Sequence, residues 1–404
     1  MNIGIVTVWG ERGASVVSKA YIEVLKDNHE ISIYSRGGEA SIRYQQADMN
    51  VWQGKISYIP ITTHIDKADF IKWLTSCKID LVLFNEQHWF EPLLWLKEMN
   101  IRSLSYIDYY TEETIPLFNL YDGLICNTKR HFKAFQDHHN VMHLPWGLDN
   151  DEYTLADNVA NKSHACFFHS CGMNPLRKGT DLLLKAAVQL SGDFELIIHS
   201  QKDLFIFYQD NPEVINCLKT LKKNNKLKII TKTVSSPGLY HLANVYVYPC
   251  RLDGLGLTVP EAISSGLPCI IPDAEPMKEF ISSACSTVKI DRFYCRKDGY
   301  YWPQQLCDID DLAKKMQHYI DCDDIEEKMN IARSHATEQL NWQDNSHVLQ
   351  SFIEQTKVAP ISPETAKYFN YFSNYGYRKI LTKIEKYKMF FNPFLFIYST
   401  LKKD

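Results

Sequence analysis

Residues 246–271 constrain the fold more than any other part of the chain; they read YVYPCRLDGLGLTVPEAISSGLPCII. An apolar strand is expected to end at Pro249, and a short helix is expected to end at Gly266, before a second apolar strand. A glycine-rich turn lies between them, with Asp253 and Glu261 at its two ends. Backbone N–H groups in such a turn can hold a diphosphate at a helix N-terminus, while the two carboxylates reach a ribose and the hydroxyls of a sugar.

This turn resembles the signature of the retaining glycosyltransferases of the GT4 family (glycosyl transferases group 1). That signature is an acid, seven residues and a glutamate, with Gly-x-Gly-Leu after the first acid. Here it reads DGLGLTVPE over residues 253–261, with Asp in place of the usual Glu. The resemblance implies that Asp253 contacts the donor sugar and that Glu261 accepts hydrogen bonds from both ribose hydroxyls. It also implies a phosphate-binding backbone around Gly254, Gly256, Leu257 and Thr258.

A second motif, GMNPLRKGTDLLLKA at residues 172–186, matches the same family. The family has a Gly-Arg pair after a strand and a Lys-Gly pair that opens the next helix. In this chain Met173 replaces the arginine, whereas Lys178 and Gly179 are present and Arg177 precedes them. We therefore expect Arg177 and Lys178 to share the charge of the donor diphosphate. The alternative is a water-exposed basic helix start, but a basic pair there opposes the helix dipole, which favours an anionic ligand.

A third acid follows the next predicted strand. Glu279, in PMKEF, matches the family's acid at the start of the following helix, so the resemblance implies a donor contact. The family's Gly-Gly turn is replaced here by residues 274–276, which read AEP.

The loop after the first predicted strand carries two glycines, Gly10 and Gly13, before Ser15. In the family such a loop faces the cleft and approaches the acceptor and the diphosphate, so both glycines are expected to contact the donor. The alternative is a tight strand-to-helix turn in which Ser15 is the N-cap.

Acceptor contacts are expected at two other strand ends of the first half. Asn85, Glu86 and His88 follow one strand, and Asp108 follows another, with Ile107 where the family has histidine. The carboxyl ends of parallel strands meet at one edge of the sheet, where ligands bind. A polar loop without function is the alternative for each.

Strands and helices alternate along the chain, which predicts doubly wound parallel sheets. Strands are expected at residues 3–8, 31–34, 81–84, 101–106, 123–127, 165–170, 195–199, 228–231, 245–248, 269–272 and 286–290. The fold class is α/β, and the resemblance implies GT-B, with two Rossmann-like domains facing a cleft and a C-terminal helical extension. The expected parts are an acceptor domain at 1–147, a donor domain at 148–340, a closing helix at 341–358 that packs back on the first domain, and an extension at 359–404.

Composition and sequence pattern exclude several classes of function and site. A net charge of −4 gives no signal for nucleic acid, and no segment has the apolar length of a spanning helix. The chain begins with a predicted strand, which argues against a signal peptide.

The eleven cysteines are an odd number with no Cys-x-x-Cys pair, which indicates reduced thiols in the cytoplasm. Asp-x-Asp triplets begin at Asp149, Asp308 and Asp321 but do not follow buried strands, so no metal is expected.

The last segment has a composition of its own. Residues 367–404 contain eight Lys or Arg, two acids and twelve Phe or Tyr. Aromatic and basic residues mixed in this way suit the surface of an anionic membrane. The alternatives are a helical extension packed on the domains and an oligomer contact.

We therefore expect a cytoplasmic enzyme that needs no cofactor, and the composition of residues 367–404 is the reason to expect it on the inner face of the membrane. It would move a sugar from a nucleotide diphosphate sugar, UDP-linked by expectation, to a hydroxyl of a glycan or lipid-linked glycan, in the synthesis of cell-surface polysaccharides or glycoconjugates. Three alternatives stay open: a sugar-nucleotide epimerase, a non-catalytic partner or scaffold, and a membrane-binding adaptor.

Overall fold

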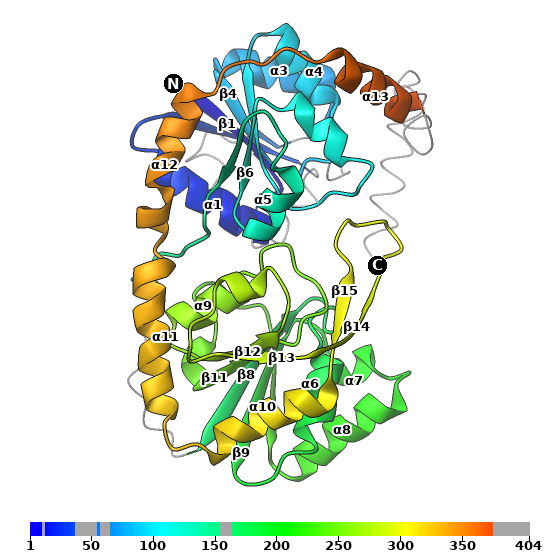
Figure 1. Ribbon diagram of the computed structural model, residues 1–404, viewed down its shortest axis with the longest axis vertical. Helices are drawn as coiled ribbons and strands as arrows, with labels where there is room; N and C mark the ends of the chain where they lie inside the picture. The colour runs from blue at the N-terminus through cyan, green and yellow to red at the C-terminus, as the bar shows by residue number, and fades with distance from the viewer. Residues whose placement is uncertain (10–12, 37–54, 57–64, 154–163, 375–404) are drawn as a thin grey trace. The chain divides into compact units, whose positions relative to one another are not determined.

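The computed structural model describes residues 1–9, 13–36, 55–56, 65–153 and 164–374 (Figure 1). The chain divides into two compact units. Unit 1 comprises residues 1–127, 131–144 and 346–404, and unit 2 comprises residues 128–130 and 145–345. Each unit has a parallel sheet covered by helices, so the predicted α/β class is confirmed.

The sheet of unit 1 has seven strands in the order β3-β2-β1-β4-β5-β6-β7. They are β1 (Asn2–Thr7), β2 (Glu30–Ser35), β3 (Lys55–Ile56), β4 (Leu81–Asn85), β5 (Arg102–Tyr106), β6 (Gly123–Cys126) and β7 (Val141–His143). The central strand β4 is buried along its whole length, as expected for a strand with helices on both faces of its sheet. The strand order reverses between β1 and β4, which is the doubly wound arrangement.

The helices of unit 1 come from both ends of the chain. They are α1 (Gly13–Leu25), α3 (Lys67–Ser76), α4 (Glu91–Glu98), the 3-10 helix η1 (Ile115–Leu120), α5 (Lys129–Phe135), α12 (Trp342–Gln355) and α13 (Pro363–Asn374). From Ser346 onward, α12 groups with unit 1. There Gln350 Oε1 lies 2.7 Å from His29 Nε2, and the Ile353 carbonyl accepts a hydrogen bond from Arg102 at 3.2 Å.

Unit 2 has a parallel sheet of six strands in the order β10-β9-β8-β11-β12-β13. They are β8 (Ala165–Gly172), β9 (Phe194–Ser200), β10 (Leu227–Thr231), β11 (Val245–Val247), β12 (Cys269–Pro272) and β13 (Ser286–Val288). Here the order reverses between β8 and β11, so unit 2 repeats the topology of unit 1. All six strands begin within two residues of their predicted starts.

Helices cover both faces of this second sheet. They are α6 (Thr180–Ala187), α7 (Leu204–Phe207), α8 (Pro212–Lys223), the 3-10 helices η2 (Tyr240–Leu242) and η3 (Met277–Glu279), α9 (Thr258–Ser264), α10 (Ile309–Asp321) and α11 (Ile325–Gln339). A separate antiparallel pair, β14 (Ile290–Tyr294) and β15 (Gln304–Cys307), completes the unit. The sequence did not predict this hairpin, and the strand expected at 286–290 was wrong at its end, because Ile290 begins β14.

Candidate functional site

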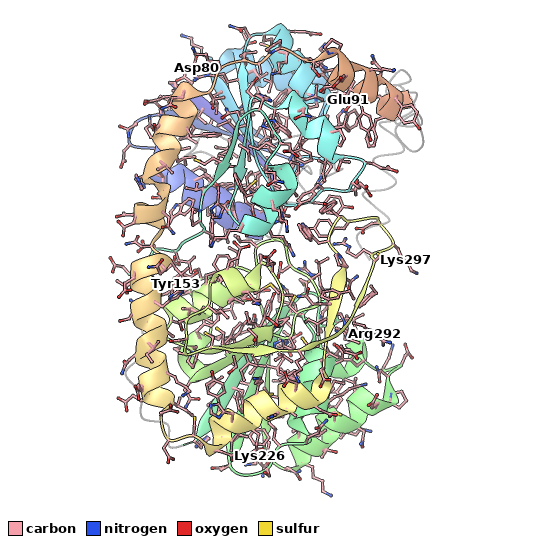
Figure 2. The ribbon with its side chains drawn as sticks, in the orientation of Figure 1. Asp80, Glu91, Tyr153, Lys226, Arg292 and Lys297 are labelled. Carbon is pink, nitrogen blue, oxygen red and sulfur yellow. The ribbon has the colours of Figure 1, made fainter. Side chains whose placement is uncertain are left out.

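The two sequence motifs meet at the point where the sheet of unit 2 reverses its strand order. β8 leads into the loop with Arg177 and Lys178, and the neighbouring strand β11 leads into the loop with Asp253. In doubly wound sheets, ligands bind outside the carboxyl ends of the strands at this reversal point. Lys226, directly before β10, marks the opposite end of the sheet (Figure 2). Topology alone therefore brings together residues that are 75 positions apart in the sequence.

Gly179 lets the two loops approach closely. It precedes α6 with a φ of 75°, in the left-handed region that favours glycine. A Cβ atom at this position would lie 1.9 Å from the carbonyl oxygen of Pro249. A side chain here would force apart the loops that carry Lys178 and Asp253, which explains why glycine follows the lysine.

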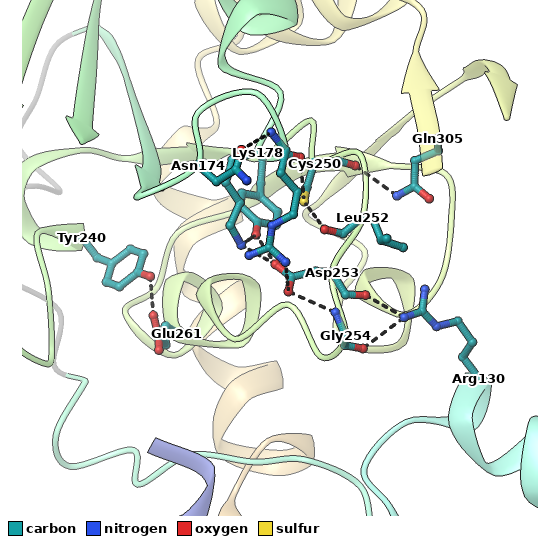
Figure 3. Close-up of polar contacts among 12 residues, drawn as sticks. Arg130, Asn174, Lys178, Tyr240, Cys250, Leu252, Asp253, Gly254, Glu261 and Gln305 are labelled. Carbon is teal, nitrogen blue, oxygen red and sulfur yellow. Dashed lines mark hydrogen bonds and ion pairs between the residues drawn. The ribbon is translucent and has the colours of Figure 1, made fainter. Parts of the chain in front are cut away.

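Lys178, Tyr248 and Asp253 form one hydrogen-bonded cluster (Figure 3). The Lys178 ammonium donates to Asp253 Oδ2 and to the Tyr248 hydroxyl oxygen. The Tyr248 hydroxyl donates to the same Oδ2 at 2.5 Å. Tyr248 is fully buried, whereas the side chains of Lys178 and Asp253 are 14% and 16% exposed. The cluster therefore presents one cation and one anion to solvent above a buried tyrosine.

Asp253 is held in its ionised form. Its Oδ1 accepts a hydrogen bond from the Gly254 N–H at 3.1 Å and lies 3.9 Å from Arg177 NH1. Burial alone would raise the pKa of Asp253, but the charges of Lys178 and Arg177, with the hydrogen bonds from Lys178 and Tyr248, hold it well below its usual range. The chain thus supplies its own anion to the basic pair. An external anion is not needed to explain that pair, contrary to the argument made from the helix dipole.

A buried ion pair fixes the two loops to each other. The guanidinium of Arg251 donates to both carboxylate oxygens of Asp181, at 2.8 and 2.7 Å, and their side chains are 7% and 11% exposed. The backbone adds to this link, because the Arg251 N–H donates to the Arg177 carbonyl at 2.8 Å. From β15, Gln305 donates its backbone N–H to Arg251 O and its side-chain amide to Cys250 O. The hairpin β14–β15 therefore supports the loop that carries Asp253.

Glu261 lies in α9 and is half-buried. Its Oε2 accepts a hydrogen bond from the Tyr240 hydroxyl at 2.6 Å (Figure 3). Burial raises the pKa of Glu261, although the hydrogen bond from Tyr240 opposes this shift. A carboxylate has more lone pairs than this single hydrogen bond uses, so Glu261 can accept further hydroxyl donors.

The start of α9 carries the predicted phosphate-binding backbone. No side chain caps this helix at Leu257, and the first N–H groups of a helix have no intrahelical partners. Gly256 has a φ of 79°, and a Cβ atom there would lie 3.0 Å from Met277 Cγ. Gly254 and Thr258 are half-buried on either side of it.

Glu279 ends the 3-10 helix η3 and is half-buried. Its carboxylate accepts hydrogen bonds from the backbone N–H groups of Lys129 and Arg130, at 2.5 and 3.1 Å, in the segment 128–130 that groups with unit 2. The Arg130 guanidinium donates to the carbonyl oxygens of Asp253 and Gly254 at 2.6 and 3.2 Å (Figure 3). Arg130 was not singled out from the sequence.

In unit 1, Gly13 is exposed at the start of α1, and Gly10 lies outside the described residues. The alternative that Ser15 is the N-cap is wrong, because the helix begins before it. Its hydroxyl instead donates to the Val8 carbonyl at 3.1 Å, which ties α1 to the end of β1.

The acceptor candidates follow two adjacent strands of unit 1, since Asn85 of β4 pairs with Tyr106 of β5. The Asn85 amide is buried and donates to the Ala14 carbonyl and to Ser18 Oγ, so this group holds α1 in place. Glu86 is half-buried with a φ of 54°. His88 and Asp108 are also half-buried, and the His88 ring packs edge-on against Tyr109 with centroids 4.7 Å apart.

The acid triplets make local contacts. Asp308 accepts the Asp311 N–H and caps α10, Asp149 accepts the Asp151 N–H, and Asp321 accepts the Gln317 side-chain amide. Within the described ranges, no cluster of three or more His, Cys, Asp or Glu side chains could hold a metal ion. All eleven cysteines are free thiols.

Only the start of the basic aromatic segment is described. α13 packs on η1 within unit 1, where the Tyr368 hydroxyl donates to the Glu113 carbonyl at 2.8 Å. Residues 375–404 lie outside the described part of the chain. Of the helices that the structure describes, none combines the length and apolarity needed to cross a bilayer.

Three further residues that contact the donor loops or α9 were missed by sequence reasoning: Tyr240, Tyr248 and Arg251. Tyr248 falls in an apolar alternation that predicts burial, and nothing local indicates that its hydroxyl meets Lys178, 70 residues earlier. Arg251 reads as an exposed loop cation, because its partner Asp181 is also 70 residues away. Such pairs can be found only when the order of the strands is known.

Comparison with known families gives one match. The family described as glycosyl transferases group 1 matches residues 161–336, which lie within unit 2 and contain both donor loops. No curated protein sequence matches the chain.

Solved structures with the same fold cover most of the chain. Anabaena HepE (Alr3699), in complex with UDP and glucose, has a TM-score of 0.65 at 14% identity, over 88% of this chain and 99% of that chain. A glycosyltransferase from Rickettsia africae ESF-5 has a TM-score of 0.66 at 15% identity, over 88% and 99%. Sucrose-phosphate synthase (tll1590) from Thermosynechococcus elongatus has a TM-score of 0.65 at 13% identity, over 88% and 98%.

At identities this low, these likenesses show the fold alone, and that fold is GT-B, with two Rossmann-like domains. The predicted fold is thereby confirmed. The function comes from the family match, which covers the loops that hold Lys178, Asp253 and Glu261. Residues 161–336 match the family of glycosyl transferases group 1, and the chain is a glycosyltransferase with the GT-B fold.

Proposed function

We propose that the chain is a retaining glycosyltransferase of the GT4 family, which moves a sugar from a UDP-sugar to a hydroxyl of a glycan or lipid-linked glycan. The observation that carries this proposal is the cluster of Lys178, Arg177 and Asp253 at the strand-order reversal of the matched domain. The choice of uracil as the base rests on Anabaena HepE, whose structures hold UDP and UDP-glucose. The pathway we infer is the synthesis of cell-surface polysaccharides or glycoconjugates.

Each part of the donor has a matching group in the site. Lys178 and Arg177 neutralise the diphosphate as it leaves, and electrostatic stabilisation of this kind often contributes more to catalysis than any other effect. The N–H groups at the start of α9, from Gly256 to Thr258, bind phosphate oxygens. Glu261 accepts the ribose hydroxyls beside Tyr240, and Asp253 accepts a hydroxyl of the transferred sugar. Glu279 contacts the donor from η3.

Unit 1 supplies the acceptor contacts in this proposal. Glu86, His88 and Asp108 follow neighbouring strand ends at the carboxyl edge of its sheet, and these side chains are half-buried. Asn85 acts indirectly, because its amide is engaged with α1. Gly13 begins α1 and Gly10 precedes it in the sequence, in the loop that we assign to acceptor and diphosphate.

The way Asp253 is held favours one route to the retention that we propose. Its Oδ2 accepts from Lys178 and Tyr248, and its Oδ1 accepts from Gly254. A carboxylate engaged in this way is a weak nucleophile towards an anomeric carbon. We therefore infer a same-face displacement, in which the leaving phosphate deprotonates the acceptor hydroxyl. NMR of the product checks the anomeric configuration, and an inverted product would rule out this mechanism.

The proposal uses no metal, since Arg177 and Lys178 carry the positive charge that the leaving diphosphate needs. Transfer activity is expected to stay at its initial rate after dialysis against EDTA. A loss of activity that Mg²⁺ or Mn²⁺ restores would contradict this assignment of charge.

A panel of donors tests the proposed function. Ligands that bind only the native state raise its stability, by about 2.7 kcal/mol at a concentration of about 100 times Kd. We expect UDP-sugars to raise the melting temperature, and GDP- and ADP-sugars to have little effect. Lys178→Ala and Glu261→Ala should abolish the shift, whereas Lys226→Ala, at the far end of the sheet, should keep it. An equal shift in all four proteins would contradict the assigned site.

A further inference from the structure

Tyr248 places a hydroxyl group inside the donor site that the proposed function leaves without a role. The residue is fully buried, and it follows β11 directly. Its hydroxyl is both a donor, to Asp253 Oδ2 at 2.5 Å, and an acceptor, from the Lys178 ammonium. The ammonium also lies 4.9 Å from the centre of the Tyr248 ring. One side chain thus contacts both the main cation and the main anion of the site.

Tyr246 shows that burial alone does not explain these contacts. It lies two residues earlier, is also fully buried, and stacks on Tyr248 with ring centroids 5.7 Å apart and an angle of 21°. Among the described residues its hydroxyl makes no hydrogen bond of ordinary geometry, and the group it interacts with is the neutral Thr258 side chain. Two buried tyrosines thus lie at the end of β11, and it is the hydroxyl of Tyr248 that meets Lys178 and Asp253.

The chemistry of a hydroxyl suits this position. It carries one donor hydrogen and two acceptor lone pairs, so it can bridge an ammonium and a carboxylate without adding charge. Phenylalanine would fill the same space and lose both contacts. Because the ring is packed beneath the two charged side chains, the hydroxyl draws the Asp253 carboxylate towards the buried side of the site. A carboxylate held there competes less with an incoming diphosphate for Lys178 and Arg177.

We propose that Tyr248 is a positioning residue of the donor site, which holds Asp253 towards the buried side of the site so that its carboxylate competes less with the diphosphate for Lys178 and Arg177. This inference rests on the proposed function, because it takes Lys178 and Arg177 as the diphosphate ligands. Without the hydroxyl, Asp253 gains freedom to move in front of the cations, and the diphosphate binds more weakly. The effect of Tyr248 therefore passes through Asp253.

A double-mutant cycle measured by calorimetric titration with UDP tests this inference. Tyr248→Phe is expected to weaken UDP binding about tenfold, the loss of one hydrogen bond to a charged group. Tyr246→Phe, the matched control, should bind UDP as the wild type does. In an Asp253→Ala background, Tyr248→Phe should change UDP binding by less than about threefold, because the carboxylate that it positions is gone.

Each outcome has a distinct meaning. If wild type does not bind UDP, or if Lys178→Ala binds it equally well, the proposed function fails. If wild type binds UDP and Lys178→Ala binds it more weakly, but Tyr248→Phe binds UDP like the wild type, the inference is overturned. It is also overturned if the two substitutions are additive, since a purely structural role for Tyr248 would give the same loss with and without Asp253.

A second comparison applies if Tyr248→Phe does not fold, as judged by its melting temperature against Tyr246→Phe. Asp253→Ala removes the carboxylate, and with it any competition for Lys178 and Arg177. If Tyr248 already holds that carboxylate away from the diphosphate, Asp253→Ala is expected to bind UDP no more than about threefold more tightly than wild type. A gain of about tenfold or more would show that the carboxylate competes freely in wild type, and would overturn the inference.

Discussion

At the scale of single residues, the charged side chains of the proposed donor site already pair with one another before any donor binds. Asp253 accepts hydrogen bonds from Lys178, Tyr248 and Gly254, and Arg177 lies 3.9 Å away. A diphosphate must therefore share two cations with a resident carboxylate. In the proposed site Asp253 therefore has two opposing effects. Its negative charge repels the diphosphate, whereas its contact with the transferred sugar favours transfer.

These opposing effects predict a split between binding and turnover for Asp253→Asn. The substitution removes the competing charge, so UDP, which carries no sugar, should bind at least as tightly as it does to wild type. Transfer should fall by about a hundredfold, the typical effect of losing one electrostatic contact in a transition state. Calorimetry and a steady-state transfer assay measure the two quantities. If UDP binding and transfer both fell to the same extent, Asp253 would instead support diphosphate binding.

A buried histidine sets a pH dependence of stability at the same scale. His169 of β8 lies 2.8 Å from both the Val247 carbonyl and the Thr180 hydroxyl, and burial lowers its pKa to about 4. In the unfolded chain its pKa is about 6.5, so the unfolded state binds more protons between these values. Stability is therefore complete above pH 6.5 and is lost as the pH falls, by about 2 kcal/mol at pH 5 for this group.

Urea unfolding at several pH values measures this contribution. In His169→Asn the stability should change less steeply between pH 6.5 and 4.5 than in wild type, whatever the variant's absolute stability. An unchanged slope would show that other groups control the acid sensitivity of unit 2.

At the scale of elements, the loops after β8 and β11 are fixed by contacts from outside themselves. The Arg251–Asp181 pair joins them, and Gln305 of β15 holds the backbone around Arg251. Because these supports are buried and hydrogen-bonded, the charged groups above them are positioned before a donor binds. Such preorganisation lowers the energy needed to reorganise the site during the reaction.

Breaking the buried pair should destabilise unit 2. Arg251→Ala leaves the Asp181 carboxylate buried without its guanidinium, which typically costs about 3–5 kcal/mol. The matched control is Lys226→Ala, which breaks the ion pair with Asp193, whose side chain is 78% exposed, and which should change stability little. Urea unfolding followed by tryptophan fluorescence measures both variants. Equal losses in the two would contradict the role given to the buried pair.

The elements that the sequence predicted well share one property. Strands such as β4 and β12 are continuous apolar runs between turn residues, and their positions agree with prediction to within a residue. The hairpin β14–β15 was missed because four of the five residues of β14 are exposed, so they show no pattern of burial. Likewise, the sequence located Lys178, Asp253 and Glu261 through motifs, but the residues that support them were not predictable, because their contacts span long separations.

At the scale of the whole molecule, two α/β units with doubly wound sheets are confirmed, and the donor site that we propose lies in unit 2. The structure describes the chain only as far as residue 374, so the membrane role of the basic aromatic segment stays a prediction. We propose that residues 367–404 bring the enzyme to the inner face of the cytoplasmic membrane. Lysine, arginine and aromatic side chains bind the surface of anionic bilayers through charge and interfacial burial.

Removal of residues 375–404 tests that proposal without touching the donor site. The shortened chain should keep the UDP-induced thermal shift and lose its sedimentation with vesicles that contain phosphatidylglycerol. Vesicles of phosphatidylcholine alone serve as the control, since they lack the negative charge. Equal sedimentation of the full and shortened chains with the anionic vesicles would assign membrane binding, if any, to another surface.

The central claim is that the donor diphosphate binds in unit 2 between the loops that follow β8 and β11. A crystal structure of the full chain with UDP tests it most directly. The account predicts phosphate oxygens within hydrogen-bond distance of Lys178 and the N–H groups at the start of α9, with the ribose on Glu261. A nucleotide bound elsewhere, with the Lys178–Asp253 pair unchanged, would contradict it.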